Sequence, residues 1–291
     1  MSAPINTAGR RVAVVTGANK GIGFEIVRGL LRELSDTTDV VLTARDVRRG
    51  EKATQELRAA AGNEARNLVF HQLDLCDTGS VDAFRQWLSD AYGGLDILVN
   101  NAGFAFKSAA IEPFAQQAEE TCAVNFSGTL RVCQALLPML RPHARVVNVS
   151  SMAGTSTILS PALRARVLAP DISVEELCRF IDEFITAAQA GGDELARQGW
   201  PTTAYGVSKV AVSALTRIHA RDFGNDVSSP GANGVLINAM CPGWCKTDMA
   251  GHSRPPRTAA EGADTAVFLA TLPVGTRDNG KFFSDRLERN W

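Results

Sequence analysis

Tyr205 and Lys209 are the pair of side chains in this sequence with the clearest chemical potential. Residues four apart in a helix project from the same face, about one turn from each other. An ammonium beside a phenol favours the phenolate, lowers the pKa of the phenol and lets it exchange a proton with a carbonyl oxygen near neutral pH. Alone the pair is a weak signal, because so short a pattern arises by chance.

Three further motifs precede this pair and make it more specific. They are TGANKGIG at 16–23, NNAG at 100–103 and VSS at 149–151. In this order, the four motifs predict hydride transfer between a nicotinamide and a carbonyl or alcohol, with the tyrosine moving the proton.

The glycine-rich segment lies between a predicted strand and a predicted helix. Its glycines permit a tight turn and the close approach of a pyrophosphate to backbone amides at a helix N-terminus. A plain strand-to-helix turn would also contain glycines, but a place after the first strand of an α/β alternation favours a dinucleotide site. The expected cofactor contacts in this loop are Gly17, Asn19, Lys20, Gly21, Ile22 and Gly23.

The end of the second predicted strand indicates the choice of cofactor. In NAD-binding folds an acidic residue there binds the ribose 2′-hydroxyl, whereas an arginine accommodates a 2′-phosphate. Here Ala44 stands where the acid is expected, Arg45 follows, and Lys20 is a second cation within reach. We therefore expect NADPH rather than NADH, the alternative being that both cations simply face solvent.

Two more strand ends supply candidate cofactor contacts. Asp74, followed by Leu75, closes the third strand and could accept the adenine amino group, or could equally cap a helix. Asn101, Ala102 and Gly103 let the backbone approach the cofactor, although a plain turn would look similar.

Short apolar strands alternate with amphipathic helices, which predicts a Rossmann-like doubly wound α/β fold. Strands that are apolar throughout are buried on both faces, as in a parallel sheet covered by helices. Strands are expected at 11–16, 40–43, 68–73, 97–100, 145–150, 235–241 and 282–283. Helices are expected at 21–34, 50–61, 80–92, 114–138, 205–222 and from 258 to a stop before 273.

The alternation breaks between Ser151 and Tyr205. A capping box at 173–176 begins one clear helix, over 173–188, whose apolar residues recur with helical spacing. We predict an inserted helical subdomain at about 152–203 before the catalytic tyrosine, within a single domain of residues 1–291.

Composition limits the range of functions. The net charge of −1 gives no support for binding to nucleic acid or an anionic membrane. No segment approaches the roughly 18 apolar residues of a membrane span, and no secretory leader is visible. Six cysteines, at 76, 122, 133, 178, 241 and 245, suit reduced thiols in a cytoplasmic protein. No metal is expected, because Cys241 and Cys245 lack a second pair of zinc ligands.

Taken together, these motifs resemble the short-chain dehydrogenase/reductase family over nearly the whole chain, from about Arg11 to Phe283. The stretches VVLTAR at 40–45, GLDILVNNAG at 94–103 and CPGW at 241–244 are similar to its monomeric carbonyl reductases. Ser151 and Tyr205 lie 54 residues apart, much farther than in most of the family. Insertions at this place are found in monomeric carbonyl reductases and in related plant terpenoid and alkaloid ketone reductases.

The resemblance implies a role for each catalytic residue. Tyr205 is expected to be the general acid, and Lys209 to lower its pKa and hold the nicotinamide ribose. Ser151 is expected to bind the substrate oxygen, with Ser150 as the alternative because strand alternation lets one of the two face the cleft. Asn125 is expected to anchor a water in a proton relay.

The resemblance also assigns the segment after the sixth strand. Pro242, Gly243 and Thr247 are expected to line the nicotinamide. Trp244 and Met249 are expected to shape the substrate pocket, with core packing as the alternative. Met240 departs from carbonyl reductases that have a cysteine there and are associated with glutathione-bearing substrates, which weakens the case for such substrates here.

The expected function is the reduction of small hydrophobic aldehydes, ketones or quinones to alcohols, with hydride from NADPH and a proton from Tyr205. The alternatives are a dedicated biosynthetic ketone reductase and a non-catalytic NADPH-binding sensor. The intact catalytic set argues against the sensor. A monomer is expected, because the helix at 173–188 would cover the surface through which family members usually pair.

Overall fold

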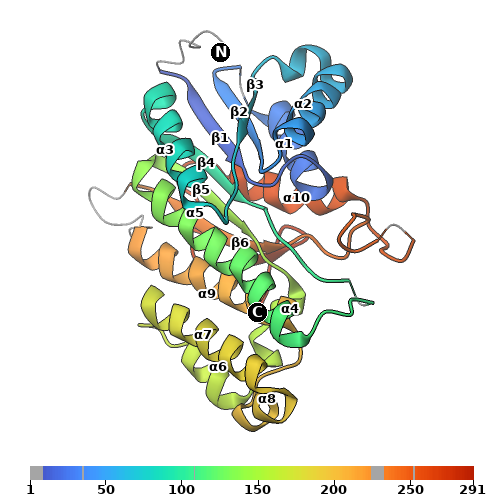
Figure 1. Ribbon diagram of the computed structural model, residues 1–291. Coiled ribbons are helices and arrows are strands. Elements are labelled where there is room, and N and C mark those ends of the chain that lie inside the picture. Colours follow the sequence, from blue (N-terminus) through green and yellow to red (C-terminus); the bar gives the residue numbers. More distant parts are fainter. Residues whose placement is uncertain (1–8, 35, 108, 224–232, 252) are drawn as a thin grey trace.

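The computed structural model describes residues 9–34, 36–107, 109–223, 233–251 and 253–291, which contain one eight-stranded sheet (Figure 1). The strands are β1 (Arg11–Val15), β2 (Thr38–Ala44), β3 (Leu68–Gln72), β4 (Leu95–Asn100), β5 (Leu140–Val149), β6 (Leu236–Cys241), β7 (Phe282–Ser284) and β8 (Leu287–Glu288). Their order is β3-β2-β1-β4-β5-β6-β7-β8, and only β8 is antiparallel to its neighbour. The predicted Rossmann-like doubly wound sheet is confirmed.

The order of the strands determines where a ligand can bind. The chain builds outward from β1 to β3 and then returns to place β4 on the other side of β1. In open α/β sheets of this kind, ligands bind beyond the carboxyl ends of the strands where the order reverses. The glycine loop follows β1 and the segment 101–104 follows β4, so both lie at this point.

Helices cover both faces of the sheet, which is why the strands are apolar throughout. One face packs against α1 (Gly21–Glu33), α2 (Val47–Ala61) and α10 (Ala259–Ala270). The other face packs against α3 (Thr78–Tyr92), α5 (Thr129–Leu136) and α9 (Ala204–Phe223). Helix α2 begins three residues earlier than predicted, because the side chain of Asp46 accepts a hydrogen bond from Arg49 N and caps it.

The helical segment predicted over 114–138 is confirmed, but it is not one continuous α-helix. It is divided into α4 (Phe114–Cys122), a π-helical turn η2 (Ala123–Gly128), α5 and a 3₁₀ turn η3 (Leu137–Met139). The apolar period continues through the break, so the sequence pattern does not reveal it. The widened turn contains Asn125, whose side chain bonds to a distant loop, and π-turns of this kind are frequent at functional sites.

The insertion consists of three helices, of which one was predicted. They are α6 (Pro161–Val167), α7 (Val174–Ala190) and α8 (Gly192–Gln198), preceded by 3₁₀ turns η4 (Met152–Gly154) and η5 (Ser156–Ile158). The two missed helices have seven residues each, too few for a periodic pattern. Helix α7 packs against α4 and α9 through Leu177, Phe180 and Phe184. Figure 1 shows the insertion at the end of the molecule beyond α9.

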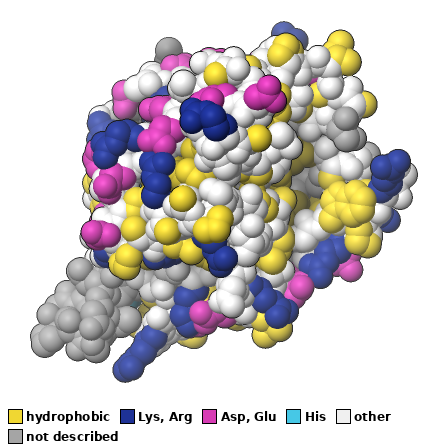
Figure 2. Space-filling model, turned by 90° about the horizontal axis from the view of Figure 1, so that it is seen from below, with side chains coloured by type: hydrophobic (Ala, Val, Ile, Leu, Met, Phe, Trp, Pro, Cys, Tyr) yellow, Lys and Arg dark blue, Asp and Glu magenta, His cyan; other side chains and the backbone are white. Residues whose placement is uncertain are grey.

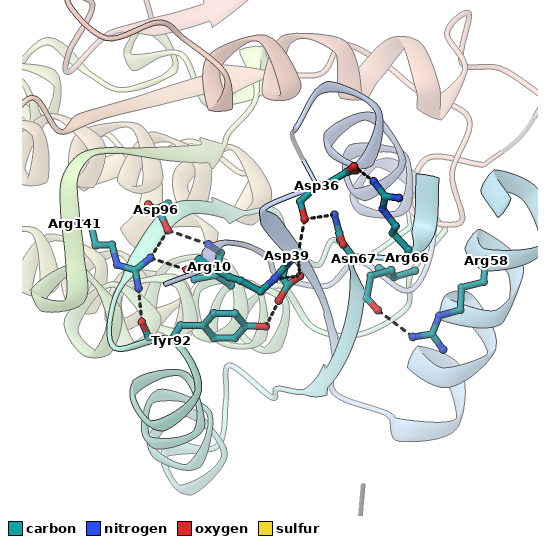
Figure 3. Close-up of polar contacts among 11 residues, drawn as sticks. Arg10, Asp36, Asp39, Arg58, Arg66, Asn67, Tyr92, Asp96 and Arg141 are labelled. Carbon is teal, nitrogen blue, oxygen red and sulfur yellow. Dashed lines mark hydrogen bonds and ion pairs between the residues drawn. The ribbon is translucent and has the colours of Figure 1, made fainter. Parts of the chain in front are cut away.

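Acid–arginine contacts tie together the amino-terminal ends of the strands (Figure 3). Asp39 on β2 accepts hydrogen bonds from Arg10 Nε at 2.9 Å and from the hydroxyl of Tyr92 at 2.9 Å. Asp96 on β4 accepts one from Arg141 Nη1 at 2.8 Å. These bonds fix the end of the sheet opposite the carboxyl ends of the strands.

The sheet ends in a short antiparallel strand. β8 has two residues, was not predicted, and is joined to β7 by Asp285 and Arg286, both at positive φ. No helix within the described ranges is both long and apolar enough to cross a bilayer.

Candidate active site

The loops after β1 and β4 pack directly against each other. Gly17 and Gly21 have φ of 61° and 59°, which favour glycine. A Cβ on Gly17 would lie 2.8 Å from the Cα of Ala102, and one on Gly23 would lie 2.3 Å from Nδ2 of Asn101. The glycines are therefore required by the fit between the two loops as well as by any ligand.

Asn101 joins these loops through its side chain. Its Nδ2 donates to the carbonyl oxygens of Thr16 at 2.9 Å and Gly17 at 3.1 Å. The hydroxyl oxygen of Thr16 in turn accepts from the amides of Asn101 and Ala102, both at 3.0 Å. Asn101, which was predicted to contact the cofactor, thus donates its side-chain amide hydrogens to protein carbonyls. It shapes the surface formed by the glycine loop and the loop after β4, here called the cradle.

The glycine loop fits a dinucleotide. Asn19 and Lys20 precede α1 and Ile22 lies in its first turn; Lys20, the N-cap residue, is extended and makes no side-chain capping bond within the described structure. The side chain of Lys20 therefore does not cap the first backbone amides of α1. The N-terminus of a helix in this state favours a bound anion. The ammonium of Lys20 pairs with Asp248 Oδ2 at 2.7 Å, on the loop after β6.

The residues predicted for the adenosine end lie at the ends of β2 and β3. Ala44 is buried at the end of β2, and the exposed Arg45 follows it directly, so a cation and no carboxylate stands at this first position after the strand. Asp74 Oδ1 accepts from the amide of Cys76 at 2.9 Å. This bond is typical of a turn, so it agrees better with a turn or capping role for Asp74 than with adenine binding. Leu75 is buried, and a Cβ on Gly128 would lie 3.0 Å from its Cβ, so Leu75 packs under the π-turn.

The loop after β6 lies against the glycine loop. A Cβ on Gly21 would lie 3.3 Å from Cγ2 of Thr247. Pro242 and Gly243 begin this loop, and Gly243 has φ of 77°. Trp244 is 54% exposed and Met249 is 39% exposed, so neither is a core residue and the packing alternative is excluded for both.

Tyr205 and Lys209 lie one turn apart at the start of α9, as the sequence predicts. The ammonium nitrogen of Lys209 is 5.7 Å from the centroid of the Tyr205 ring and donates to the carbonyl oxygen of Val149 at 2.8 Å. A Cβ on Gly154 would lie 2.5 Å from Cβ of Lys209, so the loop after β5 rests directly on α9.

The two serines after β5 face different surroundings. Ser150 is buried, and its hydroxyl donates to the carbonyl of Lys209 at 3.0 Å and pairs with Ser213 at 2.8 Å. Ser151 accepts from the amide of Ala153 at 3.1 Å, and its hydroxyl is near enough to the phenol of Tyr205 to lower the pKa of that group. Of the two alternatives, Ser151 is the one beside the phenol.

Burial controls the protonation of the pair. It raises the pKa of Tyr205 to about 12, and the hydrogen bond with Ser151 acts in the opposite direction. Burial also lowers the pKa of Lys209 to about 8. The lowered phenol pKa that the Tyr-Lys spacing suggested is therefore absent from this structure, because loss of water favours the neutral form of both groups.

Asn125 connects the loop after β4 with α9. Its Oδ1 accepts from the amide of Phe104 at 2.7 Å, and its Nδ2 donates to Phe104 O and to Ser208 Oγ, both at 2.9 Å. A Cβ on Gly103 would lie 3.4 Å from Oδ1 of Asn125 and 3.6 Å from Nζ of Lys209. Sequence reasoning missed Ser208 and Phe104, for which the sequence holds no signal beyond their adjacency to the motifs.

The thiols of Cys241, the last residue of β6, and of Cys245 take part in local turn contacts. Cys241 Sγ accepts from the amide of Gly243 at 3.3 Å, and Cys245 Sγ donates to the carbonyl of Pro242 at 3.1 Å. Across the part of the chain that the structure describes, there is no cluster of three His, Cys, Asp or Glu residues suited to a metal.

Comparison with known proteins agrees with this geometry. Residues 11–162 match the family model described as short chain dehydrogenase. The chain is 46% identical over 283 residues to Carbonyl reductase (NADPH) 1 of Bos taurus, covering 96% of this chain and 98% of that protein. The chain therefore belongs to the short-chain dehydrogenase family.

Two solved plant enzymes share the fold. Salutaridine reductase from Papaver somniferum superposes with a TM-score of 0.80 at 30% identity, covering 95% of this chain and 100% of that chain. Menthone neomenthol reductase from Mentha piperita superposes with a TM-score of 0.77 at 31% identity, covering 94% and 98%.

The lowered pKa of Lys209 makes stability depend on pH. Between about pH 8 and pH 10.5 the unfolded lysine is protonated and the folded one is not, so the free energy of unfolding rises with pH there. In the cofactor-free protein we expect Lys209→Met to remove about 1.4 kcal/mol per pH unit of this slope. Urea denaturation at pH 8–10 measures it, with exposed Lys52→Met as the control. Equal slopes in wild type and Lys209→Met would contradict the assignment.

Proposed function

We propose that Tyr205 is the proton donor in the reduction of carbonyl compounds to alcohols. The observation that carries this proposal is the place of its phenol one helical turn from the buried ammonium of Lys209, with the Ser151 hydroxyl near enough to lower its pKa. The protein is an NADPH-dependent oxidoreductase of the carbonyl reductase type, in keeping with the relatives it resembles.

We infer the cofactor contacts from the loops that follow the strands. The amides at the start of α1 would hold the pyrophosphate, Arg45 the 2′-phosphate, and Lys209 the nicotinamide ribose. Asp74, Asn101, Ala102 and Gly103 would border the adenosine and nicotinamide, with Pro242, Gly243 and Thr247 opposite. When bound, NADPH supplies the hydride.

The chain's own side chains supply orientation and the proton. Ser151 Oγ donates to the substrate oxygen and holds it beside Tyr205 Oη. A raised pKa keeps Tyr205 protonated at neutral pH, so its hydroxyl is a proton source in every enzyme molecule. As the proton leaves, negative charge develops on Tyr205 Oη, and the ammonium of Lys209 stabilises it.

Asn125 contributes to this chemistry by holding the surrounding backbone in place. Both hydrogens of its amide are given to Phe104 O and Ser208 Oγ. Its side chain therefore sets the distance between the loop after β4 and the catalytic helix. The water relay that the family resemblance implies would have to use groups other than this amide nitrogen.

Exposed apolar side chains favour hydrophobic substrates. Met152, Trp244 and Met249 are exposed and lie on the loops after β5 and β6, at the same edge of the sheet as Tyr205. These residues suit small aldehydes, ketones or quinones. A dedicated biosynthetic ketone reductase is the second candidate, which the likeness to salutaridine reductase and menthone neomenthol reductase favours.

The insertion supports a monomer. Helix α7 buries Leu177, Phe180 and Phe184 against α4 and α9, the helices through which family members usually pair. Viewed from the side of the insertion, hydrophobic side chains are interspersed with charges of both signs (Figure 2).

The six cysteines, all of them in described segments, are free thiols, which supports a cytoplasmic location.

Removal of the Tyr205 hydroxyl tests the function. We expect Tyr205→Phe to lower kcat by about a hundred- to ten-thousand-fold, because the proton donor is lost, with little change in NADPH affinity. Loss of NADPH absorbance would be followed with menadione, an isatin, an aromatic aldehyde and a cyclic terpenoid ketone. Turnover of several substrates indicates a broad reductase, and turnover of one ketone indicates the biosynthetic alternative. NADPH binding by wild type without any turnover would refute both.

Arg45 is tested by cofactor choice. Loss of its charge-assisted contact is expected to lower kcat/KM for NADPH by about 10- to 100-fold in Arg45→Ala, with NADH little affected. Lys52→Ala, an exposed change on the neighbouring helix α2, is the control. An unchanged preference for NADPH in Arg45→Ala would show that another group reads the 2′-phosphate.

The oligomeric state is measured by light scattering. The mass of one 31.1 kDa chain is expected over a wide range of concentrations. A stable dimer would overturn the proposal that α7 replaces a partner subunit.

A further inference from the structure

The tail after β8 turns back toward the catalytic region. The amide of Arg289 donates to the carbonyl of Phe282 at 2.8 Å, which aligns the tail with β7. The side chain of Trp291 then packs against Phe282, Cys241 and Ala239, and also against the core formed by α4, α7 and α9. Trp291 thus contacts both the end of β6 and the helices around the active site.

Helix α9 contributes a second contact to this indole. The guanidinium carbon of Arg217 lies 6.0 Å from the centroid of the Trp291 ring, at a cation–π distance. Arg217 also donates to the carbonyl oxygen of Leu168 at 3.3 Å, in the insertion. The ring is therefore held between the sheet, the catalytic helix and the inserted segment.

The backbone of Trp291 holds the loop that carries Ser151. The hydroxyl of Ser156 is buried and donates to the main-chain oxygen of Trp291 at 2.7 Å. Ser156 lies in the loop 151–160, five residues after Ser151. The same loop rests on α9, because a Cβ on Gly206 would lie 2.9 Å from Cδ1 of Ile158.

We propose that Trp291 and Ser156 form a latch that holds loop 151–160 on the catalytic helix and so positions Ser151 and Met152 for the carbonyl substrate. Both are positioning residues, and the inference rests on the proposed function for its kinetic consequence. The glycine loop and Arg45, which would hold the pyrophosphate and the 2′-phosphate, follow β1 and β2 and lie outside the latch. Opening the latch should therefore weaken carbonyl binding and leave NADPH binding intact.

Four variants test the latch in the full chain. Ser156→Ala removes the donor, Trp291→Ala removes the packing that places the acceptor, and Trp291→Phe restores an aromatic ring as a rescue. Thr157→Ala is the matched control, because this exposed neighbour pairs its hydroxyl with Thr155 at 2.9 Å, away from the tail. We expect KM for an aromatic ketone to rise about tenfold in the first two variants and to recover in Trp291→Phe.

A second measurement needs no turnover. Hydrogen exchange of amides 152–159 in the cofactor-free protein is expected to accelerate in Ser156→Ala and Trp291→Ala, while amides in β1 and β2 and the NADPH dissociation constant stay as in wild type. The latch would be refuted if amides 152–159 exchanged at the wild-type rate in both variants. It would also be refuted if exchange accelerated equally throughout the protein. If wild type lacked carbonyl turnover, the proposed function would fail, and exchange would still decide whether the loop is latched.

Discussion

The burial of the Lys209 ammonium is the constraint on which the rest of the site depends. A buried charge is costly unless hydrogen bonds or an opposite charge compensate for it. Here its hydrogen bond goes to a neutral acceptor, the carbonyl oxygen of Val149, and burial lowers the pKa to about 8. A positive charge in these surroundings favours a negative charge nearby. In the proposed function, this charge would stabilise a phenolate on Tyr205 as its proton leaves.

Burial of this kind requires the surrounding loops to hold their places. Gly154 lets the loop after β5 rest on Lys209, and the hydroxyl of Ser150 bonds to the lysine's carbonyl. Asn125 fixes the loop after β4 to the same helix through Phe104 and Ser208. Asn101 and Thr16 bind that loop to the glycine loop, so the glycine loop, the loop after β4 and α9 form one connected hydrogen-bonded unit.

The sequence predicts the fold well, because apolar strands and amphipathic helices follow from local spacing. Local spacing also predicts that Tyr205 and Lys209 lie together, because residues four apart are about one helical turn from each other. The π-turn at 123–128 could not be predicted, because it accompanies bonds from Asn125 to Phe104 and Ser208, which are distant in the chain. The choice between the two serines and the raised pKa of Tyr205 likewise depend on burial, which spacing does not reveal.

The pH dependence of kcat/KM for an aromatic ketone, at saturating NADPH, tests the central claim most directly. Reduction requires the proton of Tyr205 and the positive charge of Lys209, and both are lost as pH rises. We therefore predict that kcat/KM is highest near neutral pH and falls by up to about tenfold per pH unit on the alkaline side. A value that stays constant, or rises, from about pH 7 to about pH 10 would contradict proton donation by this pair.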